Sequence, residues 1–146
     1  MLDLLLAQHR EILEAANALL VAARHSPRIG MDELSRRRRH LSSLIRQHHR
    51  SEEELVFAPL LRNGTLETSP QLKAALRRIQ DEKSHYSANI GQWTPERIAA
   101  DWDGYAESVA VRVRGLAAFI EDEEEHLYRP AIALMTAPVP GRSDQA

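Results

Sequence analysis

The clearest structural signal in the chain is the stretch LSSLIRQHHRSEEELV, which runs from Leu41 to Val56. Apolar side chains recur in it every three or four residues, the spacing that gathers them on one face of an α-helix. His48 and Glu52 fall on the same face, because residues four apart in a helix are offset by only about 40° around its axis. The stretch therefore predicts a helix whose buried face presents an imidazole and a carboxylate on successive turns.

Turn-forming residues divide the whole chain into four stretches with this helical spacing. Proline, glycine, serine and asparagine concentrate in residues 26–30, 63–70 and 91–95, and these residue types end helices and form turns. Short loops between amphipathic helices favour antiparallel neighbours. We therefore expect an all-α fold, an antiparallel up-down-up-down four-helix bundle.

The expected bounds of the bundle follow from the same residue types. Ser69 and Pro70 have the residue types of a helix cap and first turn and should start the third helix, and the fourth should begin near Thr94. Pro130 should kink or end the fourth helix, because proline has no backbone N–H to donate. We expect the bundle to occupy residues 1–137 and residues 138–146 to form a disordered tail.

Composition fits one domain and limits its chemistry. Of the 146 residues, 43% are hydrophobic and 27% charged, as in a single globular domain. The net charge of −2 provides no overall basic field for nucleic acid or acidic membranes, and the run Arg36–Arg39 is typical of a solvated helix face. Without cysteine, any metal must bind to nitrogen and oxygen ligands. The lack of a leader and of a long apolar span predicts a soluble, cytoplasmic protein.

Histidine and carboxylate also interrupt the apolar faces of the other helices. His9 lies within the first stripe, His85 at the edge of the third and Glu123 within the fourth. A single histidine in such a place is more often a core residue with a local hydrogen bond. On four faces at once, however, buried polar groups are costly unless a cation compensates them. Imidazole and carboxylate suit iron, manganese or zinc, so the pattern predicts a metal site inside the bundle.

Four segments resemble, in the same order, the hemerythrin-like family of HHE cation-binding domains. They are QHREI at residues 8–12, HHRSEEELVFAP at 48–59, EKSH at 82–85 and EEEHLYRP at 123–130. The likeness extends over about residues 2–135, and the second segment is its most specific part. In that family a four-helix bundle typically holds two non-haem irons, bridged by carboxylates and an oxo or hydroxo group, and binds dioxygen, nitric oxide or peroxide.

By position, the resemblance implies a metal ligand on each helix. His9 would match the ligand of the first helix, and His48 and Glu52 the histidine and the bridging carboxylate of the second. His85 would match the ligand of the third helix, and Glu123 the bridging carboxylate of the fourth. The implied cofactor is a pair of non-haem irons, and the implied ligand is a small oxidant.

The sequence departs from the family pattern at one ligand position. Phe119 stands where the family places a histidine, four residues before Glu123. His49 occupies a place where some relatives have an accessory carboxylate, and can either serve the second iron or lie outside the site. The second iron position is therefore expected to be less completely liganded than the first.

Three functions fit these residues. The first is a di-iron protein, with an asymmetric or impaired centre, that carries, senses or stores a small oxidant. The second is an enzyme in which the metal reduces peroxide or oxygen. The third, of a different class, is a metal-free bundle that acts as a protein-interaction module. In that case Phe119 would mark a metal site that has decayed. Metal content separates the first two from the third.

Overall fold

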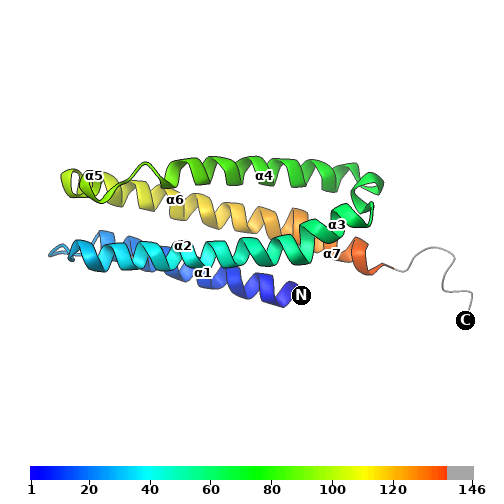
Figure 1. Cartoon of the computed structure of the whole chain (residues 1–146), viewed down its shortest axis with the longest axis horizontal. Coiled ribbons are helices and arrows are strands. Elements are labelled where there is room, and N and C mark those ends of the chain that lie inside the picture. Colours follow the sequence, from blue (N-terminus) through cyan, green and yellow to red (C-terminus); the bar gives the residue numbers. More distant parts are fainter. Residues whose placement is uncertain (138–146) are drawn as a thin grey trace, which may run out of the picture.

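Four long helices form the body of the protein and run side by side in alternating directions (Figure 1). The computed structural model describes residues 1–137, and for Thr65 and residues 86–90 it describes the backbone alone. The long helices are α1 (Leu2–Ala23), α2 (Met31–Glu52), α4 (Pro70–Ile90) and α6 (Trp102–Glu123). Within the described residues there is no strand, so the expected all-α fold is confirmed.

Six short helical elements connect or extend the long helices. They are η1 (Glu53–Phe57), α3 (Ala58–Arg62), η2 (Thr65–Thr68), α5 (Pro95–Ala100), η3 (Glu124–Tyr128) and α7 (Arg129–Thr136). The third long helix starts as the sequence predicts, because α4 begins at Pro70 and the backbone N–H of Leu72 donates to the Ser69 hydroxyl at 3.3 Å.

The fourth segment is two helices rather than the single one that was expected to begin near Thr94. The Thr94 hydroxyl does cap α5, accepting from the backbone N–H of Arg97 at 3.2 Å. A second cap then starts α6, because the Asp101 carboxylate accepts from the backbone N–H of Gly104 at 3.0 Å. A Cβ atom on Gly104 would lie 2.1 Å from an Asp101 carboxylate oxygen, so any other residue there would push the Asp101 side chain out of this cap geometry.

Two π-helical turns follow directly after the carboxylates Glu52 and Glu123. In η1 the N–H of Ala58 donates to the carbonyl of Glu53, and in η3 the N–H of Arg129 donates to that of Glu124, five residues back in each case. A proline closely follows each turn, at positions 59 and 130, and its ring would crowd the carbonyl four residues earlier in a regular helix. The wider turn relieves this crowding.

The chain consequently stays helical beyond Pro130. The sequence predicted that this proline would kink or end the fourth helix, whereas α7 continues to Thr136. The helix accommodates the proline through the preceding π turn instead of stopping. Such turns often occur at functional sites.

Two groups of buried side chains form the core, one toward each end of the bundle. The first includes Leu5, Val56, Leu60, Ile79 and Leu127, and the second includes Leu19, Leu34, Trp93, Ile98 and Tyr105. Glu52 and Glu123, which precede the π turns, lie at the end of the bundle that the first group of buried side chains occupies.

The predicted tail, residues 138–146, lies outside the described residues. In the part that the structure describes, no helix combines the length and apolar character needed to cross a membrane.

The packing predicts a large difference between two leucine-to-alanine substitutions. Leu34 is fully buried and Leu61 is 66% exposed. Leu34→Ala should lower the free energy of unfolding by about 2–5 kcal/mol, because it leaves a cavity in the core. Leu61→Ala, the control, should change it by less than about 0.5 kcal/mol. Denaturant titration measures both values, and equally small effects would contradict this description of the core.

Candidate metal centre

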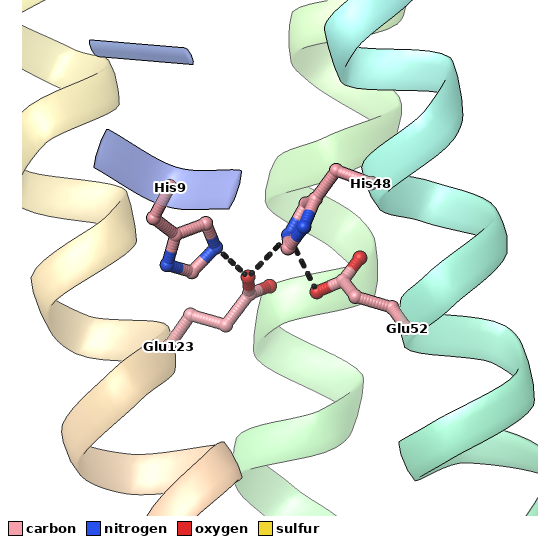
Figure 2. A group of neighbouring side chains, drawn as sticks. All are labelled: His9, His48, Glu52 and Glu123. Carbon is pink, nitrogen blue, oxygen red and sulfur yellow. Dashed lines mark hydrogen bonds and ion pairs between the residues drawn. The ribbon is translucent and has the colours of Figure 1, made fainter. Parts of the chain in front are cut away.

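Three helices bring four ligand-type side chains together inside the bundle. His9 comes from α1, His48 and Glu52 from α2, and Glu123 from α6. One ligand atom from each lies within 4.8 Å of all the others, and all four residues are buried. Figure 2 shows the two imidazole rings and the two carboxylates pointing toward one another.

The distances between these atoms suit a shared ion. The Nε2 atom of His9 lies 3.1 Å from Oε1 of Glu123. The Nε2 atom of His48 lies 3.6 Å from Oε2 of Glu52 and 3.8 Å from the same oxygen of Glu123. Ligand atoms that share one transition-metal ion at 2.0–2.2 Å are roughly 3–3.5 Å apart. The cluster would have to contract to hold an ion, because its ligand atoms lie within 4.8 Å of one another rather than at that spacing.

Neighbouring side chains orient both imidazole rings. Nδ1 of His48 lies 2.8 Å from the amide oxygen of Gln8, whose NH₂ group donates to Ser51. Because that oxygen can only accept, Nδ1 of His48 carries a proton. Nδ1 of His9 lies 2.7 Å from a carboxylate oxygen of Glu124, which likewise favours a proton on Nδ1. Both rings therefore turn Nε2 toward the cluster, as metal-binding histidines do when their other nitrogen donates to a neighbouring side chain.

Tyr128 fills the space between the four ligand-type groups. Its hydroxyl lies 2.6 Å from Oε1 of Glu123 and makes a short hydrogen bond to Oε2 of Glu52. It is also 3.0 Å from Nε2 of His48 and 3.3 Å from Nε2 of His9. Burial, together with the charges of Glu123 and Glu52, raises the pKa of Tyr128 far above its usual range. The phenol thus stays protonated and donates to the carboxylates.

Lys83, on α4, supplies positive charge to the two carboxylates. Its ammonium group makes a short ion pair with Oε1 of Glu52 and lies 3.7 Å from Oε2 of Glu123. Oε2 of Glu123 is buried and has no hydrogen-bond partner among the described groups. This incompletely satisfied oxygen belongs to a donor set of two imidazoles and two carboxylates, which fits a divalent transition-metal ion.

Glu123 is held in its charged form. Burial would raise the pKa of Glu123, but hydrogen bonds with His48 and His9 outweigh it and hold the pKa well below its usual range. Burial would lower the pKa of His48, but hydrogen bonds with Glu123 and Glu52 outweigh it and raise the pKa. Glu123 is therefore anionic, which favours the binding of a cation.

Two of the six residues proposed as ligands lie apart from this cluster. His49 is exposed on α2, with its ring centroid 6.3 Å from that of His48. His85 is exposed on α4. Their role as ligands stays a prediction. Phe119, which stands where the family has a histidine, is buried in the first core group.

Sequence reasoning missed Lys83 and Tyr128, although the chain contains a signal for each. The buried positions 72, 76 and 79 of α4 continue to 83 with helical spacing, so the lysine lies on the inner face. His85 lies about 200° further around the axis. Tyr128 follows Glu123 by five residues, and the π turn between them brings such a pair onto one face.

The hydrogen bonds of Tyr128 predict a stability effect in the metal-free protein. Tyr128→Phe should lower the free energy of unfolding by about 1–3 kcal/mol, because two buried carboxylates lose a shared donor. Tyr105→Phe is the matched control, since Tyr105 is equally buried but lies in the second core group. Thermal and denaturant unfolding measure both. A loss no greater for Tyr128→Phe than for the control would show that the hydroxyl does not satisfy the carboxylates.

Comparison with known proteins agrees with this geometry. Residues 1–132 match the family model described as the hemerythrin HHE cation binding domain. Neither a curated protein nor a solved structure shows significant similarity to the chain. The matched range covers all four long helices and every residue of the cluster. The chain therefore belongs to the hemerythrin HHE cation-binding domain family.

Proposed function

We propose that this domain binds non-haem iron on His9, His48, Glu52 and Glu123, and that the bound metal binds or reacts with dioxygen, nitric oxide or peroxide. The observation that carries the proposal is the buried set of four ligand atoms within 4.8 Å of one another. Neutral imidazole and carboxylate suit iron, manganese and zinc. Iron is the choice that the hemerythrin resemblance implies. When bound, it would supply a redox-active centre with room for a small ligand.

The surrounding residues have defined parts in this proposal. Gln8 and Glu124 hold the histidine rings with Nε2 directed inward, so that the rings need not turn on binding. Tyr128 places a phenol oxygen, and thus a proton donor, next to the same atoms. Such a donor can hydrogen-bond a small oxygen-containing ligand beside the metal.

A cavity next to the cluster supports access by a small molecule. It has a volume of about 610 Å³, and its lining includes His9, His48 and Glu123 at the cluster. Further along, most of the lining is apolar, with side chains such as Ile12, Leu41, Ile45, Val109 and Val113. An uncharged diatomic molecule can enter such a space without a desolvation penalty.

The second iron of the di-iron hypothesis is also part of the proposal, with a less complete ligand set. His49 and His85 are exposed and would have to turn inward to bind it, while Phe119 offers no donor atom. Unequal affinity of the two positions follows, with the first filled before the second.

Two other functions remain to be separated from this one by experiment. An enzyme would consume peroxide or oxygen over many turnovers, whereas a carrier or sensor would bind without net consumption. A metal-free interaction module would purify without metal even from iron-rich cells. The buried anionic cluster favours the metal-binding alternatives, because such charges are costly without a cation.

Metal content and stability test the proposal together. Protein made in iron-replete cells should contain iron, show charge-transfer absorption in air, and melt at a lower temperature after the metal is removed, since a ligand that binds only the native state stabilises it. His48→Ala should weaken metal binding by at least about 10–100-fold, because removing a group that only hydrogen-bonds to a metal ligand already has an effect of that size. Elemental analysis and metal titration measure these effects.

The matched control is His40→Ala, an exposed histidine of the same helix, which should keep its full metal content. Metal retention by His48→Ala equal to that of the control would refute the site. An unmodified protein that purified without metal and bound none on titration would favour the interaction module.

A further inference from the structure

Each carboxylate of the cluster has one oxygen on the histidine side and one on the lysine side. Oε1 of Glu123 and Oε2 of Glu52 are the oxygens near Nε2 of His48. Oε2 of Glu123 and Oε1 of Glu52 are the oxygens near the ammonium of Lys83. The two carboxylates therefore lie between two cation positions, one beside the imidazoles and one already taken by an ammonium group.

The ammonium position is built into the fold. The side chain of Lys83 is only 19% exposed, and its Nζ lies 4.9 Å from the centre of the Phe57 ring, within range of a cation–π contact. Lys83 also continues the inner stripe of α4, the translucent green helix behind the cluster in Figure 2. His49, on α2, lines the same cavity as Lys83, but its side chain is exposed, whereas Phe119, on α6, is apolar and offers no ligand atom.

Charge balance favours one metal beside this lysine. Three carboxylates contact the centre: those of Glu52 and Glu123, and that of Glu124 through His9. With both histidines neutral, as metal binding requires, Lys83 and one divalent ion balance these three charges. A second divalent ion at the same carboxylate oxygens would also be repelled by the ammonium of Lys83.

We propose that the ammonium of Lys83 permanently occupies the position of a second metal, so that this domain holds a single metal ion and a lysine side chain on its two shared carboxylates. The inference rests on the proposed metal site. Instead of a di-iron centre whose two positions differ in affinity for iron, it predicts a centre that holds one metal ion even at saturating iron. Lys83 acts as a positioning residue that determines how many metal ions the domain binds.

The first test uses the unmodified protein and its lysines, of which there are only two, Lys73 and Lys83. Lys73 serves as an internal reference, because it lies on the same helix and its side chain is 45% exposed. The protein is treated with an amine-acylating reagent before and after loading with Fe(II) without oxygen, and the labelled peptides are quantified. Lys83 should react more slowly than Lys73 in both states. A rise of Lys83 to the reactivity of Lys73 on loading would show that metal displaces it.

The second test changes the number of metal ions. At saturating Fe(II), the unmodified protein and Lys73→His should each bind one metal per chain. Lys83→His, which replaces the ammonium by a ligand, should bind two. If Lys83→His also saturates at one, or the unmodified protein saturates at two, the inference is wrong while the proposed metal site stands. If neither protein binds metal, the proposed function fails and the inference with it.

Discussion

The structure depends on the burial of two carboxylates, Glu52 and Glu123, at the same level of the bundle. Burying an uncompensated carboxylate is costly, and these two are 0% and 1% exposed. The fold surrounds them with groups that can neutralise or donate to negative charge: imidazoles, a phenol and an ammonium group. A divalent cation is the further partner that suits this arrangement.

Local backbone structure follows from this requirement. The helices that carry the carboxylates each continue into a π turn and then a proline-containing helix. On α6 and η3, the added residue in the turn brings Tyr128 onto the face of Glu123, where its hydroxyl reaches both carboxylates. Gln8 and Glu124 fix the imidazole rings from outside. The centre is thus organised by contacts within the protein, and a metal among the four ligand atoms would displace or bind the Tyr128 hydroxyl.

Much of this arrangement was predictable from the sequence, because burial imposes a period of 3.6 residues on each helix. The stripes identified the four helices and the inward positions of His9, His48, Glu52 and Glu123, all of which are buried. Lys83 was not among the predicted site residues, because helical spacing alone does not show that a lysine at an inward position pairs with buried carboxylates. The π turns depend on how the following prolines pack, which helical spacing alone does not encode. The split between α5 and α6 depends similarly on the local Asp101 cap.

The central claim is that this cluster is a metal site at which Lys83 remains bound to the carboxylates. Anomalous diffraction at the iron edge, from crystals grown with Fe(II), tests it most directly. The account predicts one strong peak within bonding distance of Nε2 of His9 and His48, with the ammonium of Lys83 still on Oε1 of Glu52. A map without a peak at the cluster, or with iron bound to the exposed His85 instead, would contradict it.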